Sequence, residues 1–424
     1  MSIVTQARAE PDRATSHRCR SCGAALTHAF VDLGTSPLAN RYLTESELEE
    51  PEPLFPLRVY VCEGCFLVQL PPVVSPAEIF EDYAYFSSYS ESWLRHARAF
   101  AEGMVERIGL DSTSRVIEIA SNDGYLLRYF KEGDVRVLGI EPAVNVAAAA
   151  EEAGIPTLVE FFGLDTARRL RAEGEQADLL VGNNVLAHVP DLTGFVAGLK
   201  TLLGPRGMAT MEFPHLLRLI ESGEFDTIYH EHLFYFSLIA VERVFAQAGL
   251  TLFDVEELPT HGGSLRIFAR HADDDSKPIE DAVGELRLRE RQAGLDRLDA
   301  YESFDERTRE VKRGLLDFLI QRKREGKSIV GYGAPAKGNT LLNYCGIRGD
   351  FLDYVVDRSP HKQGLFLPGT HLPILDPGAV SQTKPDYLLI LPWNLRDEIM
   401  EQMSHVREFG CKFVVPIPET VVYD

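Results

Sequence analysis

The sequence lacks the long apolar runs that mark membrane proteins. No stretch of its 424 residues approaches the length needed to cross a bilayer, and the first residues contain no apolar core of a signal peptide. With 45% hydrophobic and 25% charged residues, the composition is that of a soluble globular protein. We therefore expect two or three domains, a cytoplasmic location and no association with a membrane.

Positive charge is scarce. The sequence contains 43 Lys and Arg residues against 64 Asp and Glu residues, which gives a formal net charge of −21. Nucleic acids and anionic membrane surfaces attract basic proteins, so this balance argues against both as partners. Solubility is the simplest explanation of the acidic surplus.

Cysteine is rare, and its spacing is informative. Of the six cysteines, four form two C-x-x-C pairs, Cys19 with Cys22 and Cys62 with Cys65. In a large chain such pairs are typical of an intracellular zinc site rather than of disulfides, because four thiolates complete the tetrahedral shell of Zn²⁺. No ligand position remains open, so we expect a structural site. Two unrelated surface pairs are the alternative.

The stretch 116–127, VIEIASNDGYLL, predicts the first strand–turn–helix unit of an open parallel sheet. An apolar run ending at Ile119 is typical of a buried strand, and apolar positions recur at helical spacing after the turn. The turn holds a single glycine, Gly124, and two carboxylates lie beside it, Glu118 and Asp123. A phosphate-binding turn would need several glycines and no carboxylates. These carboxylates instead suit a cation or sugar hydroxyls, bound at the carboxyl ends of the strands.

A second acidic position supports a nucleoside-like ligand. The next predicted strand, 135–140, ends at Glu141, where nucleotide-binding folds place an acid that binds ribose. Together with the acidic turn, this favours S-adenosylmethionine, a sulfonium cation attached to adenosine. The aromatic pair Phe161-Phe162 at a later strand end would cover the adenine ring, with core packing as an equal alternative. The residues predicted to surround the cofactor are Glu118, Ala120, Asn122, Asp123, Gly124, Glu141, Phe161, Asn183 and Asn184.

Titratable side chains are dense in one aromatic stretch. His230 and His232 flank Glu231, and Tyr229 precedes them. This spacing is not that of a zinc protease, whose histidines lie four residues apart on a helix. It predicts an acid–base cluster in which one neutral imidazole is the general base, oriented by the carboxylate or by another ring, and His188 could join from a separate strand end. A loop with aromatic packing is the alternative.

Two further stretches predict substrate contacts. Dense tyrosine and serine between Tyr83 and Trp93 are typical of a polar ligand pocket, with packing between domains as the alternative. From residue 328 a second α/β unit begins, and its turn GYGAPAKGN carries Lys337 before a predicted helix. Backbone N–H groups, a helix N-terminus and a cation suit a diphosphate. A purely structural glycine turn is the alternative.

Four features occur in one order: the two C-x-x-C pairs, EIASNDG, YHEH and GYGAPAKGN. In this combination, over about residues 19–420, the sequence resembles the nucleotide-sugar C-methyltransferases, such as the dTDP-sugar 3-C-methyltransferases that build branched deoxysugars of antibiotics. The resemblance implies an α/β protein with a small zinc-binding domain, a Rossmann-like S-adenosylmethionine-dependent methyltransferase domain and a second Rossmann-like α/β domain that helps to hold the sugar nucleotide. We expect these domains at residues 1–75, 76–265 and 266–424.

The resemblance also implies residue roles. It places zinc on the four paired cysteines and assigns proton abstraction to His232, supported by Tyr229, Glu231 and His188. The residues expected to bind a nucleotide-sugar substrate are Tyr83, Tyr89, Lys337, Asn339, Asp357 and Arg358. A chain that carries all three domains can work as a monomer. Two rival functions are a methyltransferase acting on an O or N atom of a related glycoside, and a non-catalytic protein for ligand binding or assembly.

Overall fold

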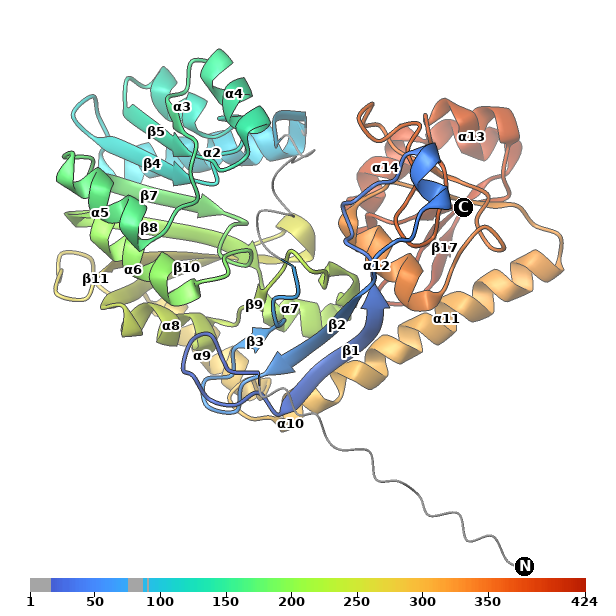
Figure 1. The fold of residues 1–424 in the computed structure, drawn as a ribbon, viewed down its shortest axis with the longest axis horizontal. Helices are drawn as coiled ribbons and strands as arrows, with labels where there is room; N and C mark the ends of the chain where they lie inside the picture. Colours follow the sequence, from blue (N-terminus) through green and yellow to red (C-terminus); the bar gives the residue numbers. More distant parts are fainter. Residues whose placement is uncertain (1–16, 75–86, 90) are drawn as a thin grey trace, which may run out of the picture.

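The computed structural model describes residues 17–74, 87–89 and 91–424, and these residues form three sheets (Figure 1). In the view of Figure 1, a seven-stranded sheet lies on the left and a six-stranded sheet on the right, with a four-stranded sheet below and between them. No helix in the described ranges is long and apolar enough to cross a membrane. The predicted α/β fold class is confirmed.

The four-stranded sheet is antiparallel, in the order β1-β2-β3-β9. Its elements are β1 (His28–Ser36), the short helix η1 (Glu45–Glu49), β2 (Phe55–Val61), β3 (Val68–Gln69) and β9 (Phe234–Tyr235). β2 and β3 form the hairpin that carries the second cysteine pair. β9 comes from far along the chain and pairs with β3, Val68 facing Tyr235. The stretch that follows His232 is therefore fixed to the N-terminal sheet.

The seven-stranded sheet has the order β10-β11-β8-β7-β4-β5-β6, in which β11 runs antiparallel to both of its neighbours, β10 and β8, and the other neighbouring pairs are parallel. The strand order reverses between β4 and β7, and open α/β sheets bind ligands at the carboxyl ends beside such a point. Its strands are β4 (Arg115–Ile119), β5 (Arg136–Ile140), β6 (Thr157–Leu158), β7 (Ala177–Asn183), β8 (Leu203–Pro214), β10 (Leu250–Leu258) and β11 (Ser264–His271). The helices between them are η2 (Ser87–Tyr89), α2 (Glu91–Ile108), α3 (Leu127–Glu132), α4 (Val144–Glu152), α5 (Leu164–Ala172), α6 (Leu192–Leu202), α7 (Leu216–Ser222), η3 (Phe225–Thr227), α8 (Leu238–Gln247) and η4 (Thr260–Gly262).

The six-stranded sheet has the order β14-β13-β12-β15-β16-β17 and is parallel except for β17. Its order reverses between β12 and β15, so a second ligand-binding edge is expected there. Its elements are β12 (Ile329–Tyr332), α12 (Ala336–Cys345), β13 (Val355–Val356), β14 (Ile374–Leu375), α13 (Gly378–Thr383), β15 (Tyr387–Ile390), η5 (Trp393–Leu395), α14 (Arg396–Gln402), η6 (Ser404–Phe409), β16 (Lys412–Val415) and β17 (Val421–Tyr423). The strand β13 is short although the sequence is mostly apolar from Phe351 to Val356, because the chain at Leu352 turns back and its N–H donates to the Arg348 carbonyl.

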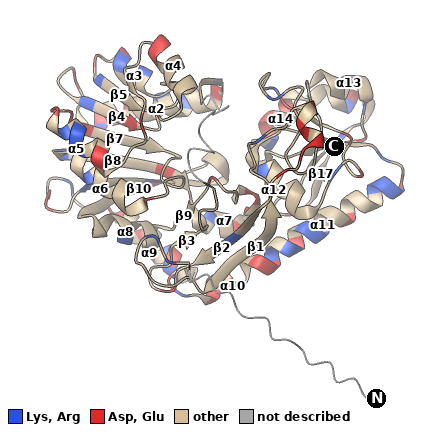
Figure 2. Ribbon diagram, in the orientation of Figure 1, with Lys and Arg blue, Asp and Glu red and all other residues tan. Residues whose placement is uncertain are grey.

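Three helices connect the two larger sheets: α9 (Asp281–Gln292), α10 (Asp299–Glu302) and α11 (Phe304–Arg324). Phe304 of α11 stacks on Phe30 of β1, with ring centroids 4.5 Å apart. Acidic and basic residues are interspersed along the outer face of α11 (Figure 2). Residue 265, the expected end of the second domain, lies within β11. The domain boundaries given above stay predictions.

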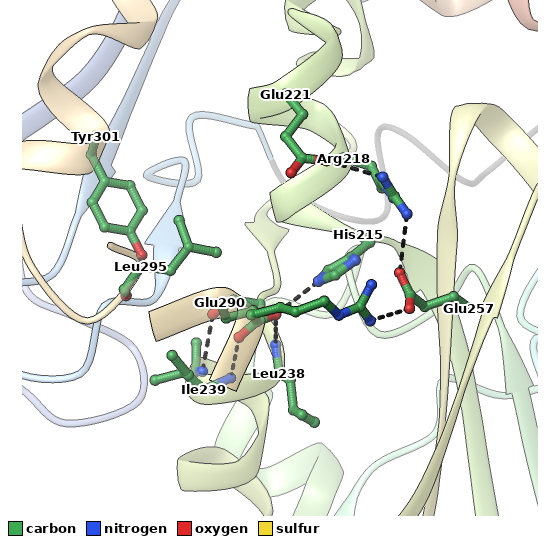
Figure 3. A network of polar contacts seen from close by, with 12 residues as sticks. His215, Arg218, Glu221, Leu238, Ile239, Glu257, Glu290, Leu295 and Tyr301 are labelled. Atoms are coloured by element: carbon green, nitrogen blue, oxygen red, sulfur yellow. Dashed lines mark hydrogen bonds and ion pairs between the residues drawn. The ribbon is translucent and has the colours of Figure 1, made fainter. Parts of the chain in front are cut away.

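A buried network fixes α9 against the seven-stranded sheet (Figure 3). The carboxylate of Glu290 accepts hydrogen bonds from the backbone N–H groups of Leu238 and Ile239, at 2.7 and 2.9 Å, where α8 begins. It also lies 2.7 Å from Nε2 of His215, which precedes α7. The side chains of Glu290 and His215 are fully buried. This network anchors the two helices on either side of the Tyr229–His232 stretch.

Candidate active site

The four predicted zinc ligands lie together, with their Sγ atoms within 4.8 Å of one another. Cys19 lies 3.5 Å from Cys65. Cys22 lies 3.4 Å from Cys62. Sulfurs around zinc at 2.3 Å are about 3.8 Å apart in a tetrahedron, so the donor set fits one Zn²⁺. The amide of Gln69 donates to Cys19 Sγ at 3.1 Å and would orient that ligand.

A cavity of about 480 Å³ lies at the carboxyl ends of the central strands of the seven-stranded sheet. Its lining includes the predicted cofactor residues Ala120, Asn122, Glu141, Phe161, Asn183 and Asn184. Three other predicted cofactor residues, Glu118, Asp123 and Gly124, are not part of this lining. Phe162 lies beside Phe161 and packs edge-on against Phe195, with centroids 5.3 Å apart. The apolar wall at this end of the cavity suits an adenine ring.

The turn after β4 has an unusual backbone. Ala120, Asn122 and Gly124 have φ angles of 54°, 50° and 75°, in the left-handed region that side chains other than glycine seldom adopt. At Gly124 a Cβ atom would also approach Ile155 to 2.8 Å, so glycine is needed there. The side chain of Asn122 accepts a hydrogen bond from the N–H of Ser87 at 2.8 Å. Strained backbone of this kind concentrates at functional sites.

Carboxylates give the cavity its electrostatic character. Glu141 is 5% exposed, and its two oxygens accept hydrogen bonds from the N–H groups of Asn122 and Ala143 at 3.0 and 2.9 Å. Burial raises the pKa of Glu141 and raises the pKa of Glu118 well above its usual value, and the charge of Asp123 adds to both shifts. A cation would relieve this destabilisation of buried negative charge. The residues present therefore fit S-adenosylmethionine.

The YHEH stretch directs each of its side chains to a different neighbour. Nδ1 of His232 donates to the Thr227 carbonyl at 2.8 Å, and its Nε2 lies 2.7 Å from the Tyr229 hydroxyl. Because Nδ1 carries the proton of the neutral ring, Nε2 accepts from Tyr229. Burial lowers the pKa of His232 well below its usual value, with a further contribution from His188. His232 is therefore neutral at pH 7.

The other members of this stretch face different elements. Glu231 accepts a hydrogen bond from Asn40 of the N-terminal domain at 2.7 Å, and burial raises its pKa to about 7. His230 turns away and donates to the Pro56 carbonyl at 3.3 Å. In the described ranges, the four cysteines are the group that converges as metal ligands do, and His230, Glu231 and His232 do not.

His188 connects the base to the cofactor cavity. It lines the cavity, and its ring centroid lies 4.8 Å from that of His232. Burial lowers its pKa to about 4, partly offset by a hydrogen bond with the backbone of Glu231. The sequence suggested that His188 could join the cluster, and the fold brings the two rings into contact.

The predicted substrate residues are dispersed. Tyr83 lies outside the described residues, as does the side chain of Tyr89. Lys337 donates to Asn394 at 2.8 Å and lies over the Trp393 ring, and burial lowers its pKa.

The remaining predicted substrate residues differ in whether their polar groups already bind other parts of the protein. Asn339 donates to the Ala39 carbonyl at 2.6 Å. Asp357 accepts from two backbone N–H groups, those of Ala334 and Ser359. Arg358 is exposed.

Three residues near the site were not predicted from the sequence as site residues. Trp93 lines the cavity, Asn40 binds Glu231, and His261 lies 3.2 Å from Asn184 through Nε2. Trp93 belongs to the tyrosine-rich stretch, and two glycines follow His261, which is a weak signal of a special backbone conformation. Asn40 carries no local signal.

The cavity lies where the strand order of the seven-stranded sheet reverses, and it has buried acids and an aromatic end. Together these features define an S-adenosylmethionine-dependent methyltransferase. Three family models match successive parts of the chain: a zinc binding domain over residues 19–80, a methyltransferase domain over 93–255 and a C-methyltransferase C-terminal domain over 259–418.

Among curated proteins, the C-methyltransferase NovU of Streptomyces niveus is 36% identical over 401 residues, which cover 95% of each chain. A ubiquinone biosynthesis O-methyltransferase of Methylobacterium sp. (strain 4-46) is 33% identical over 97 residues, 22% of this chain and 38% of that protein. Among solved structures, a protein of Pyrococcus horikoshii OT3 is 14% identical and matches 46% of this chain and 98% of its own, with a TM-score of 0.37.

The chain belongs to the C-methyltransferases. It is an S-adenosylmethionine-dependent enzyme with a zinc-binding N-terminal domain, as the resemblance implied. A non-catalytic role and transfer to oxygen or nitrogen are thereby set aside.

Proposed function

We propose that the enzyme methylates C3 of a 4-keto-deoxysugar nucleotide, with dTDP as the nucleotide, in deoxysugar and antibiotic biosynthesis. The observation that carries this proposal is the neutral base His232, which touches the cofactor cavity through His188. Methylation at carbon needs a carbanion, and a ketone makes the neighbouring C–H acidic enough for a histidine to remove. An O-methyltransferase would have no need of a keto group.

His232 is the proton acceptor in this mechanism. The Thr227 carbonyl holds the ring proton on Nδ1, so that Nε2 presents the lone pair. When the substrate ketone binds, the Tyr229 hydroxyl turns from Nε2 to the ketone oxygen. Nε2 then takes the C3 proton, and the C–H electron pair becomes the C=C bond of the enolate while the oxygen takes the negative charge.

Bound S-adenosylmethionine supplies an electron-poor methyl group, and the chain holds it with Glu141 and the acidic turn. His188 lies between the base and the cavity and keeps the reacting carbon close to the methyl group. Burial of His188 and Glu231 excludes water from the enolate. The zinc site has no part in these steps and stabilises the N-terminal domain.

We assign the nucleotide to the edge where the order of the six-stranded sheet reverses. The N-terminus of α12 and the exposed guanidinium of Arg358 favour an anion there. Asn339 and Asp357 are already engaged by Ala39 and by backbone N–H groups, so their contribution is to shape this edge. We further propose that the enzyme works as a monomer in the cytoplasm.

The test uses the purified enzyme and dTDP-4-keto-deoxysugars in D₂O. Without S-adenosylmethionine, C3–H should exchange for deuterium; with it, mass and NMR should show one new methyl on C3. His232→Asn should slow both reactions on the order of 10²–10⁴-fold. Two results would refute the proposal: no exchange or methylation with any 4-keto sugar, or a new methyl on oxygen or nitrogen. Exchange retained in His232→Asn would remove His232 from the base role.

A further inference from the structure

The loop Thr260–Gly263 holds a histidine in a strained conformation beside the active site. His261 has φ 57° and ψ 15°, in the left-handed region. Gly262 and Gly263 follow with φ angles of 101° and 139°. A Cβ atom on Gly262 would lie 2.7 Å from the Trp393 ring, so only glycine lets the loop approach this closely. Such strain persists only where several surrounding contacts hold the backbone in place, and it concentrates at functional sites.

Several hydrogen bonds hold this loop in place. The Thr260 hydroxyl donates to Glu212 at 3.0 Å. The Gly263 carbonyl accepts from the N–H of His215 at 3.0 Å, and the Ser264 hydroxyl donates to the Thr260 carbonyl at 3.0 Å. These contacts hold the backbone on both sides of His261 and leave its ring as the part directed to the site.

His261 lies against two residues that line the cofactor cavity. Its Nε2 is 3.2 Å from Nδ2 of Asn184, and its ring centroid is 5.4 Å from that of Trp93. Asn184 and Trp93 both line the cofactor cavity, whereas His261 itself does not. The charge of His261, when the ring is protonated, lowers the pKa of His232, so the two imidazoles lie within electrostatic range of each other. Through Asn184 and Trp93, His261 therefore lies against the wall of the cofactor cavity.

The contact with Asn184 defines which nitrogen of His261 carries a proton. The amide N–H of Asn184 is a donor, so Nε2 accepts and the neutral ring bears its proton on Nδ1. Burial lowers the pKa of His261 to about 4, so the ring is neutral at pH 7. Among the described residues, Nδ1 makes no hydrogen bond. A neutral imidazole N–H of this kind is a suitable donor to a developing enolate.

We propose that His261 is a catalytic residue whose Nδ1–H donates a hydrogen bond to the ketone oxygen of the acceptor as it becomes the enolate oxygen. Together with the Tyr229 hydroxyl it forms a two-donor oxyanion site. No proton leaves His261 in this step: the electron pair of the broken C–H bond is delocalised onto the oxygen, and the C–H proton goes to His232. This role rests on the proposed function.

The test is the rate of C3 deuterium exchange without S-adenosylmethionine, in His261→Gly and His261→Asn. Glycine removes the donor and accepts the left-handed conformation without strain, and asparagine tolerates that conformation and keeps an N–H donor. We expect His261→Gly to lose about 10²–10³-fold in exchange rate, with His261→Asn recovering part of it. Affinity for S-adenosylmethionine, measured by calorimetry, should change by less than about threefold. His405→Asn, at an exposed histidine on η6, is the matched control.

Two outcomes would overturn this role. Exchange in His261→Gly within about threefold of wild type would show that no donor is lost. A loss of cofactor affinity as large as the loss of exchange would make His261 a structural part of the cofactor site. If the wild type itself exchanges no proton of any 4-keto sugar, the proposed function fails first, so the two failures are distinguishable.

Discussion

The Tyr229 hydroxyl lies 2.7 Å from Nε2 of His232, and the two rings lie against each other with centroids 4.0 Å apart. A turn creates this pairing, because the N–H of His232 donates to the Tyr229 carbonyl at 2.9 Å. The basic nitrogen is thus capped by a phenol until a better acceptor for the phenol proton arrives. In the proposed mechanism, this arrangement would couple exposure of the base to binding of a ketone.

Tyr229→Phe should slow C3 exchange by about 10²-fold, because one of the two donors to the enolate is lost while the ring contact with His232 remains. The hydroxyl stabilises neutral His232, so its removal should also raise the pKa of His232. The acid limb of the pH–rate profile should then move to higher pH. Tyr235→Phe is the matched control, since Tyr235 is also buried near His232. An unchanged rate and pH profile in Tyr229→Phe would contradict the coupling.

Glu231 should make stability depend on pH. Its pKa in the folded protein is raised to about 7 by burial, against an ordinary value of 4.5. The contribution of Glu231 to the free energy of unfolding is therefore fully present below about pH 4.5 and is lost as pH rises through about 7. Relative to Glu231→Gln, wild type should lose on the order of 3 kcal/mol of unfolding free energy between pH 4.5 and 8, measured by urea denaturation.

The Asn40 amide opposes this shift, because it stabilises the carboxylate. Asn40→Ala should therefore raise the pKa of Glu231 further and extend the loss of stability to higher pH. The same substitution made in Glu231→Gln should show no such pH dependence, which separates the pair from general packing effects. An identical pH dependence in both backgrounds would refute the coupling.

Removal of zinc should destabilise the N-terminal sheet and, through β9, the catalytic stretch. Each of Cys19→Ser, Cys22→Ser, Cys62→Ser and Cys65→Ser should lower the zinc content from one ion per chain and the melting temperature by roughly 5–10 °C. Cys345→Ser and Cys411→Ser, at buried cysteines outside the cluster, should retain the ion. Atomic absorption measures the zinc content, and thermal melting measures the stability. Full zinc content in the ligand variants would contradict the assignment of these four cysteines as zinc ligands.

Glu290→Gln should cost about 3 kcal/mol of unfolding free energy. Its carboxylate accepts from the first turn of α8 and contacts His215 in a fully buried position (Figure 3), and an amide would replace one acceptor by a donor. Glu306→Gln, at an exposed surface pair with Arg313, should change the unfolding free energy far less, because water screens such pairs. Equal effects of the two substitutions in urea denaturation would show that the buried network adds nothing.

Local patterns were sufficient for much of the fold. The apolar run before Ile119 and the cysteine spacing predicted a parallel strand and a zinc site, and both are confirmed. The two-residue strand β13 shows the limit of such patterns. The mostly apolar run from Phe351 would allow a longer strand, but a turn closed by Leu352 and Arg348 takes the first of these residues. The family, too, followed from four motifs in order, and the relatives confirm it.

The sequence by itself determined the zinc site and the first parallel strand, because ligand spacing and strand periodicity act over a few residues, and the resemblance of four ordered motifs gave the class of enzyme. Only the tertiary structure decided which distant residues surround His232. Asn40 reaches Glu231 across 191 positions, and His261 meets Asn184 across 77. Such contacts depend on how the sheets and loops pack, because long-range burial carries no periodic signal along the chain.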